Sequence, residues 1–372
     1  MIRSALASLS MFAALSISTF AATSYVIVNN NSHTANSVSV YKMDTANGTL
    51  SFFGKVGTTG QSLSGGIVAV GQAITSDAHC LFAIDTQSND IAAFASPSYK
   101  LVGKFSNSAL NFNLNAGGTI TVSPNGRFLY GAYTGSMNIG AWRVNPNCSL
   151  SFIAAYVPSI GADTYSGVGV SPNGTVLVVS APDFSAAESF KIASNGSLTD
   201  LGSASFASVS SCASTGCFPA ALDFTKDSKI VVFGNSSIQP SVLTVSLGTN
   251  GALTNPQEWD LPNSQHLVFS NAVFLSAGAY AGSGFLYVGM FFGVVTARFS
   301  ESPLSITTTN STTISGYTGG LASTGDTLVL TEPPQTLGTF KVNSDGSLTP
   351  LSTITDTAAG SVLWPTIYPN VR

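Results

Sequence analysis

The chain has 372 residues and a formal net charge of −4, and only 8% of its residues are charged whereas 44% are hydrophobic. It has no cluster of Lys or Arg, which argues against nucleic-acid binding because that binding depends on neutralising phosphates. Beyond the N-terminus no apolar run approaches the roughly 20 residues that a spanning helix needs, so no membrane span is predicted.

The N-terminal segment, MIRSALASLSMFAALSISTFAA, has the pattern of a secretory signal peptide. Arg3 is followed by an apolar stretch and then by the small residues Thr19 and Ala21, which fit a cleavage site after Ala21. We therefore predict a signal peptide over residues 1–21 and a single mature domain over residues 22–372, secreted to the periplasm or the extracellular space. The alternative, a buried first helix, is disfavoured because polar, strand-like sequence follows at once.

One phrase recurs along the mature chain. VSPNGRFLYGAYTG begins at Val122 and VSPNGTVLVVSAP begins at Val170, and each places a tight turn between two apolar runs. Units such as AESFKIASNGSLTDLG then add two more strands around an Asn-Gly type of turn, which tolerates the positive φ of tight hairpins. Each unit thus has four strands, A to D, over roughly 40–50 residues, the period of propeller blades.

Seven such units can be counted, and no long stretch has the 3.6-residue period of a helix. In chain order, the predicted B strands are Tyr25–Val28, Cys80–Ile84, Phe128–Ala132, Val176–Ser180, Ile230–Gly234, Phe285–Gly289 and Thr327–Leu330. The first unit lacks strand A, and the extra C-terminal segment SVLWPTIYP is expected to supply it and close the ring. We predict an all-β, seven-bladed propeller of four-stranded antiparallel blades; a two-domain β-sandwich is the alternative.

The four cysteines fit an exported protein. Cys212 and Cys217 lie in the short loop SCASTGC, which a disulfide can close. For Cys80 and Cys148 two alternatives stay open, a second disulfide between neighbouring blades or two unpaired buried thiols. The cysteines form no Cys-x-x-Cys pair, so no metal site is predicted.

The phrases VSPNGRFLY, VSPNGTVLV, SVSVYKMDTANGTLSFFG and NSDGSLTPLS resemble the lactonase-like seven-bladed propeller family. That family includes 6-phosphogluconolactonase and the fungal carboxymuconate lactonizing enzyme, so the resemblance implies a propeller fold and lactonase or cycloisomerase activity. Its enzymes have a Pro-His pair entering strand A. At the matching position this chain has Gly117 and Gly118, and the His, Glu and Arg set of the lactonizing enzyme is not found residue by residue.

Strand order assigns the short A–B and C–D turns to one face of the ring and the longer B–C and D–A connections to the other, where function is expected. The candidate acid–base residues on that face are Asp85, Asp90, Asp183, Glu188 and His266. The candidate ligand-binding residues are Asn89, Tyr133, Asp163, Tyr165, Tyr317 and Glu332. The carboxylates could also form Asx turns without a chemical role. No cofactor is predicted, although several converging carboxylates could hold a divalent cation in the central funnel.

Two functions therefore remain. The first is a non-catalytic, monomeric binding scaffold for a small molecule or an extracellular partner. The alternative is a lactonase or lactonizing isomerase. Its substrate would be neutral or weakly charged, because no Lys or Arg is predicted in the funnel, although Lys55 and Lys104 can reach its rim.

Overall fold

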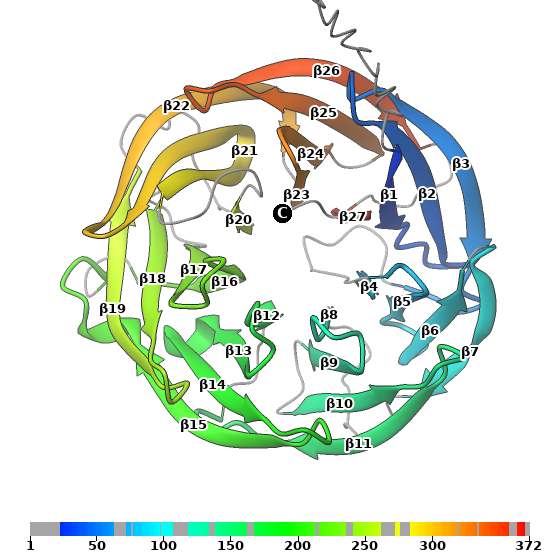
Figure 1. Ribbon diagram of the computed structural model, residues 1–372, viewed down its shortest axis with the longest axis horizontal. Coiled ribbons are helices and arrows are strands. Elements are labelled where there is room, and N and C mark those ends of the chain that lie inside the picture. Colours follow the sequence, from blue (N-terminus) through cyan, green and yellow to red (C-terminus); the bar gives the residue numbers. More distant parts are fainter. Residues whose placement is uncertain are drawn as a thin grey trace, which may run out of the picture.

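The computed structural model describes residues 23–62, 72–75, 77–96, 98–106, 118–133, 138–161, 167–212, 216–235, 241–261, 272–275, 283–317, 320–332, 335–356 and 363–368. Its seven antiparallel sheets form a ring (Figure 1). In each sheet, a short strand lies nearest the centre of the ring and a long strand lies at the rim of the ring. The all-β, seven-bladed propeller predicted from the repeat is confirmed. The predicted signal peptide lies outside the described residues.

The strands of each blade run from the centre outward in the order A to D. Blades one to three contain β27 (Leu363–Tyr368), β1 (Thr23–Asn29), β2 (Ser37–Asp44), β3 (Leu50–Gly57); β4 (Gln72–Ile74), β5 (Cys80–Asp85), β6 (Asp90–Ala95), β7 (Lys100–Ser106); β8 (Gly118–Val122), β9 (Phe128–Tyr133), β10 (Ile139–Val144) and β11 (Leu150–Tyr156). Blades four and five contain β12 (Gly167–Val170), β13 (Val176–Ala181), β14 (Ala186–Ile192), β15 (Leu198–Ser205); β16 (Pro219–Phe224), β17 (Ile230–Asn235), β18 (Ser241–Leu247) and β19 (Leu253–Asp260). Blades six and seven contain β20 (Ala272–Leu275), β21 (Ser283–Glu301), β22 (Leu304–Tyr317); β23 (Gly320–Thr324), β24 (Thr327–Glu332), β25 (Thr336–Val342) and β26 (Leu348–Thr355). Two single-turn 3₁₀ helices, η2 (Pro182–Phe184) and η3 (Phe206–Ser208), lie in blade four.

Blade six differs from the expected pattern because β21 runs without a break through both its B and C strands. The N-terminal part of β21 pairs with β20 and the C-terminal part pairs with β22. The Arg298 guanidinium lies 5.6 Å from the centre of the Phe285 ring. An extended strand would place these residues roughly 40 Å apart, so β21 folds back on itself. The predicted B strand Phe285–Gly289 is its first half.

Both faces of each sheet are buried, and this explains why the B strands read as unbroken apolar runs. In β5, β13 and β17 every residue is buried, whereas the outer strand β7 alternates between exposed and partly buried positions and the outer strand β3 is mostly exposed or partly buried. In the part of the chain that the structure describes, the buried residues form seven hydrophobic clusters, and each cluster combines side chains from two neighbouring blades. Between blades two and three, for example, Phe82 and Ile84 pack with Leu129 and Trp142. The core therefore lies between the blades.

The repeated Ser-Pro-Asn-Gly phrase forms the A–B turns of blades three and four, as predicted. In blade three the Ser123 hydroxyl donates to Asn125 Oδ1 (2.8 Å) and accepts from the Phe128 backbone N–H (3.0 Å). Thr75 and Asp77 take the equivalent positions in blade two, where the Thr75 hydroxyl donates to the carboxylate. The turn thus needs a hydroxyl and a side-chain acceptor two residues later, and local sequence supplies both.

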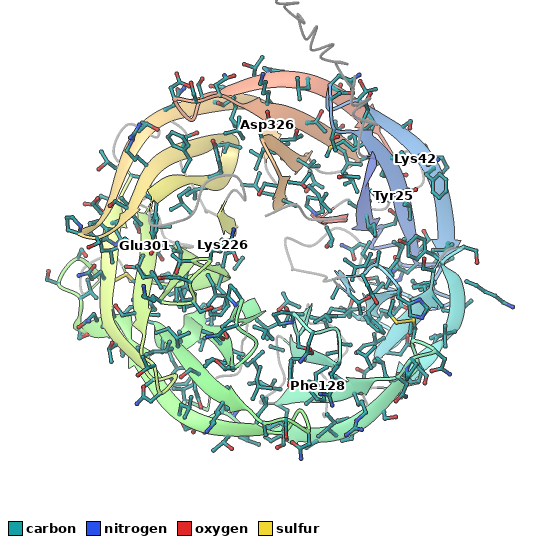
Figure 2. All side chains as sticks on the ribbon, in the orientation of Figure 1. Tyr25, Lys42, Phe128, Lys226, Glu301 and Asp326 are labelled. Carbon is teal, nitrogen blue, oxygen red and sulfur yellow. A yellow bond between two sulfur atoms is a disulfide. The ribbon has the colours of Figure 1, made fainter. Side chains whose placement is uncertain are left out.

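In blades one, four, five and seven, the C–D turn has a glycine that packs against the preceding blade. Gly196 of blade four has φ +88°, and a Cβ built there would collide with the Phe128 ring of blade three. Phe128 is labelled at the start of β9 in Figure 2. The Gly196 carbonyl also accepts a hydrogen bond from the buried Tyr130 hydroxyl (3.1 Å). Gly346 of blade seven repeats the arrangement on Phe285 and Tyr287.

Two disulfides tie the fold together (yellow bonds in Figure 2). Cys80 is bonded to Cys148, with their Cα atoms 5.3 Å apart, and this bridge joins blades two and three. Cys212 is bonded to Cys217 within the connection that follows η3. The predicted Cys212–Cys217 disulfide is confirmed. Of the two alternatives left open for Cys80 and Cys148, the disulfide between neighbouring blades is present, and the pair of free thiols is wrong.

Strand β27 closes the ring. It pairs antiparallel with β1, so that Val26 lies opposite Ile367 and Tyr25 opposite Tyr368. The last strand of the chain is therefore the innermost strand of the first blade, as the missing A strand predicted. No helix within the described ranges is long and apolar enough to span a membrane.

We expect deletion of residues 358–372 to abolish cooperative unfolding. The deletion removes β27, exposes the inner edge of β1 and opens the packing between blades seven and one. A chain truncated after Tyr368 keeps every described strand and serves as the control. Circular dichroism measures the thermal melting of both truncated chains. Equal melting curves would contradict the role of β27 in closing the ring.

Two glycines of blade four test the packing between blades. Gly202 has φ +95° and open space where a Cβ would lie, whereas Gly196 has φ +88° and the Phe128 ring in that place. We expect Gly202→Ala to cost about 1 kcal/mol of unfolding free energy through backbone strain. Gly196→Ala should cost roughly 1–3 kcal/mol more because it also overpacks the blade interface. Urea unfolding measures both, and equal losses would show that the close approach has no energetic role.

Candidate functional site

The strongest candidate site lies between blades one and two, on the face that carries the B–C and D–A connections. The Asn-rich segment after β1 places Asn36 beside Asp85, the last residue of β5. Asn36 Nδ2 and the Thr58 hydroxyl both donate to Asp85 Oδ1, at 2.7 and 2.8 Å. Asn29 holds this segment in place by donating to the Ile84 carbonyl (2.9 Å) and accepting from Asn36 Nδ2 (2.8 Å).

These two hydrogen bonds do not reach the second carboxylate oxygen of Asp85, Oδ2. Asp85 is fully buried, and its Oδ2 atom has no hydrogen-bond partner. Gly60 lies directly against this oxygen, where a Cβ would collide with it. Desolvation by burial raises the pKa of Asp85 to about 7, and the neighbouring Asp90 carboxylate raises it further, while the Asn36 and Thr58 hydrogen bonds oppose these effects. Asp85 is thus poised to exchange a proton near neutral pH.

Asp90 lies directly opposite Asp85 in the β5–β6 register. Its Oδ1 atom is buried without a hydrogen-bond partner, and its Oδ2 atom forms an ion pair with Lys104 Nζ at 2.8 Å. Each of the two carboxyl groups therefore has one buried oxygen without a hydrogen-bond partner. Lys104 also donates to the Thr59 carbonyl (3.2 Å), and its side chain is 30% exposed. This partly exposed position agrees with the expectation from the sequence that Lys104 reaches the rim of the funnel.

Glu188 behaves differently from the aspartate pair. It is fully buried and lies within β14, not in a B–C loop as we expected from the sequence. Its carboxylate accepts from the Ser159 N–H (2.8 Å) and hydroxyl (3.0 Å) and from the Ile160 N–H (3.1 Å). Burial raises its pKa and these three donors lower it. Glu188 therefore fastens blade four to the connection that leaves blade three.

The remaining candidates are dispersed. Asp183 is exposed in η2, and Asn89 occupies the turn between β5 and β6 with φ +57°. Tyr133, Tyr317 and Glu332 are the last residues of β9, β22 and β24. Asp163, Tyr165 and His266 lie outside the described residues. Of the acid–base candidates that are described, the structure brings together Asp85 and Asp90 only.

The structure also adds residues that sequence analysis missed. Asn36, Thr58 and Gly60 belong to the Asp85 environment, and Glu258 accepts from the Ser241 hydroxyl (2.6 Å) and Asn235 Nδ2 (3.2 Å) in blade five. One signal was available, since a polar residue ends several apolar B strands: Asn29, Asp85, Asn235 and Glu332. Their partners come from neighbouring strands or blades and have no local signature.

The carboxylates proposed for a divalent cation occupy two separate blades, with Asp85 and Asp90 in blade two and Asp183 and Glu188 in blade four. Two other groups of metal-binding residue types occur among the described residues, and both contain disulfide-bonded cysteines. A bonded cysteine has no thiolate to offer to a metal. Neither group therefore forms a metal site.

No protein-family profile matches the sequence, and no curated protein does. Solved structures do match. A proposed 6-phosphogluconolactonase from Bacteroides fragilis is 14% identical with a TM-score of 0.73, covering 94% of this chain and 99% of that one. The periplasmic gluconolactonase of Pseudomonas aeruginosa is 15% identical with a TM-score of 0.70, covering 93% and 99%. The resemblance to lactonase-like seven-bladed propellers is thus confirmed at the level of the fold.

The raised pKa of Asp85 predicts a pH-dependent stability. Because its pKa in the folded chain is about 7, above the roughly 3.9 of an unfolded aspartate, the folded state binds the proton more tightly between these values. This group's contribution to stability is fully present below about pH 4 and is lost as the pH rises through about 7. Asp85→Asn removes the titration, so wild type should lose stability relative to this variant between about pH 4 and 7.

Urea unfolding at a series of pH values measures this difference. Asp183→Asn is the matched control, because Asp183 is an exposed carboxylate on the same face, and its curve should run parallel to that of wild type. A constant difference between wild type and Asp85→Asn across this range would contradict the shifted titration.

Proposed function

We propose that this protein is a lactone hydrolase that acts on a neutral or weakly charged lactone through the Asp85–Asp90 pair and Lys104. The observation that carries the proposal is the buried carboxyl pair beside the Lys104 ammonium group on the loop face of the ring, in which burial raises the pKa of Asp85 to about 7. The names of the structural neighbours, a gluconolactonase and a proposed 6-phosphogluconolactonase, favour hydrolysis over a non-catalytic binding scaffold.

The chemistry divides between the two carboxyl groups. Asp90 is the general base, because its side chain is 9% exposed and contacts Lys104, whereas Asp85 is fully buried. When Asp85 loses its proton, its negative charge lies opposite Asp90 and favours proton transfer from water to Asp90. Asp85 is therefore a positioning and tuning residue.

Hydrolysis then needs only water as the second reactant. Asp90 takes a proton from a water molecule as the water oxygen bonds to the lactone carbonyl carbon. The Lys104 ammonium stabilises the resulting oxyanion. The bond between the acyl carbon and the ring oxygen breaks, and the proton passes from Asp90 to the departing alkoxide, which yields a hydroxy acid. No cofactor is required by this scheme.

The charge of the site favours a substrate without a phosphate group. Lys104 is already paired with Asp90, so it cannot neutralise a multiply charged substrate without losing that partner. We further propose that the enzyme is an exported monomer. The periplasmic location in the name of the Pseudomonas aeruginosa neighbour agrees with the signal peptide expected from the sequence.

Purified protein should hydrolyse neutral aldonolactones, and Asp90→Asn should lower kcat/KM by about 10²–10⁴-fold, the typical contribution of a general base. The wild-type rate should rise as the pH passes through about 7, following the pKa of Asp85. Asp85→Asn should flatten that profile, and Lys104→Met should lower kcat through the lost oxyanion contact.

Asp183→Asn is the control for a loop-face carboxylate without a role, and its turnover should equal that of wild type. Circular dichroism verifies that each variant is folded. Turnover unaffected by Asp90→Asn, or no turnover of any neutral lactone by wild type, would refute the proposal and favour the binding scaffold.

A further inference from the structure

A cavity lies among the tight turns, on the face of the ring opposite the proposed lactone site. It measures about 370 Å³ and is lined by the A–B turn of blade two and by the A–B and C–D turns of blade three. We call it the turn-face cavity; its wall includes His79, Arg127 and Arg143. Its volume falls at the lower end of the range of small-molecule sites.

The turn-face cavity concentrates positive charge in an acidic protein. The chain has five arginines and a net charge of −4. Three of these arginines are described, and two of the three, Arg127 and Arg143, line this cavity. Both are exposed, and no carboxylate in the described ranges lies within ion-pair distance of either. Arginine guanidinium groups recognise carboxylates and phosphates through paired N–H donors.

Asp77, an acidic residue of the cavity wall, forms hydrogen bonds within its own A–B turn. Asp77 Oδ1 accepts from the Thr75 hydroxyl (2.5 Å) and from the His79 N–H (3.0 Å), and these bonds lower the pKa of Asp77. Its charge offsets one of the two guanidinium groups, which leaves the lining with a net positive charge.

The cavity wall is held rigidly. The Cys80–Cys148 disulfide joins the two blades beside the cavity, and His79 Nε2 lies 2.9 Å from the Pro146 carbonyl, to which it donates. The Arg127 guanidinium lies 5.3 Å from the centre of the Phe128 ring, which restrains it. A preorganised wall lowers the entropy cost of binding.

We propose that the turn-face cavity binds a small organic oxyanion, a carboxylate or a phosphate ester, through Arg127 and Arg143. This site is separate from the proposed lactone site because the two open on opposite faces of the ring. The two faces thereby suit different ligands: the loop face presents a paired lysine to a neutral lactone, and the turn face presents unpaired arginines to an anion.

The test is isothermal titration calorimetry of the full-length mature protein with three probes of similar size. Gluconate carries only a carboxylate, glucose 6-phosphate carries only a phosphate, and glucose carries neither. We expect one molecule of oxyanion per chain, weaker binding at higher salt, and no binding of glucose. Binding of one probe only would identify which oxyanion the cavity takes.

Arg127→Gln and Arg143→Gln should each weaken binding by about 10-fold, since each removes charge-assisted hydrogen bonds. Arg298→Gln is the matched control, because Arg298 is an exposed C-strand arginine stacked on Phe285 in blade six, away from this cavity. Its affinity should equal that of wild type. Absence of oxyanion binding, equal binding of glucose, or unchanged affinity in the double Arg127→Gln, Arg143→Gln variant would overturn the proposal, whatever the outcome of the lactonase assay.

Discussion

The whole structure depends on the burial of each sheet on both of its faces. A sheet whose B strand is buried at every position, such as β5 or β13, has no face to present to water. It is stable only between two neighbours, and a row of such sheets leaves two unburied faces unless it closes on itself. The pairing of β27 with β1 joins the first and last blades and removes those two faces. Closure of the ring is therefore a requirement of the core.

The same packing between blades determines what polar groups can do. At the loop face, the ends of strands from neighbouring blades lie close enough for side chains to bond across the interface, as Asn36 and Asp85 do. Burial there removes water from carboxyl groups that the sequence places at strand ends. Whether a buried carboxyl becomes a structural or a chemical group is then decided by the donors that the neighbouring blade provides.

Asp85 and Glu188 illustrate this difference. Both are fully buried, and burial raises the pKa of both. Glu188 receives three donors that reach both of its oxygens, so its charge is stabilised and it fastens a loop. Asp85 receives donors at one oxygen only, while Gly60 and Asp90 crowd the other. An unsatisfied oxygen beside a second carboxylate favours proton exchange over a purely structural role.

The sequence alone determined the local features of this protein. Tight turns such as Ser123–Asn125, the seven B strands and the missing first A strand depend on residues close together in the chain, so they could be predicted. The same holds for the Cys212–Cys217 disulfide, whereas the sequence left the pairing of Cys80 with Cys148 open. The tertiary structure decided which polar residues meet. Asp85 and Asp90 were candidates on equal terms with Asp183 and Glu188, and the difference arises from Asn36, Thr58, Gly60 and Lys104, which reach the pair from other strands and blades. Desolvation and hydrogen bonding across a blade interface depend on distances between segments that are remote in sequence, and no local pattern encodes them.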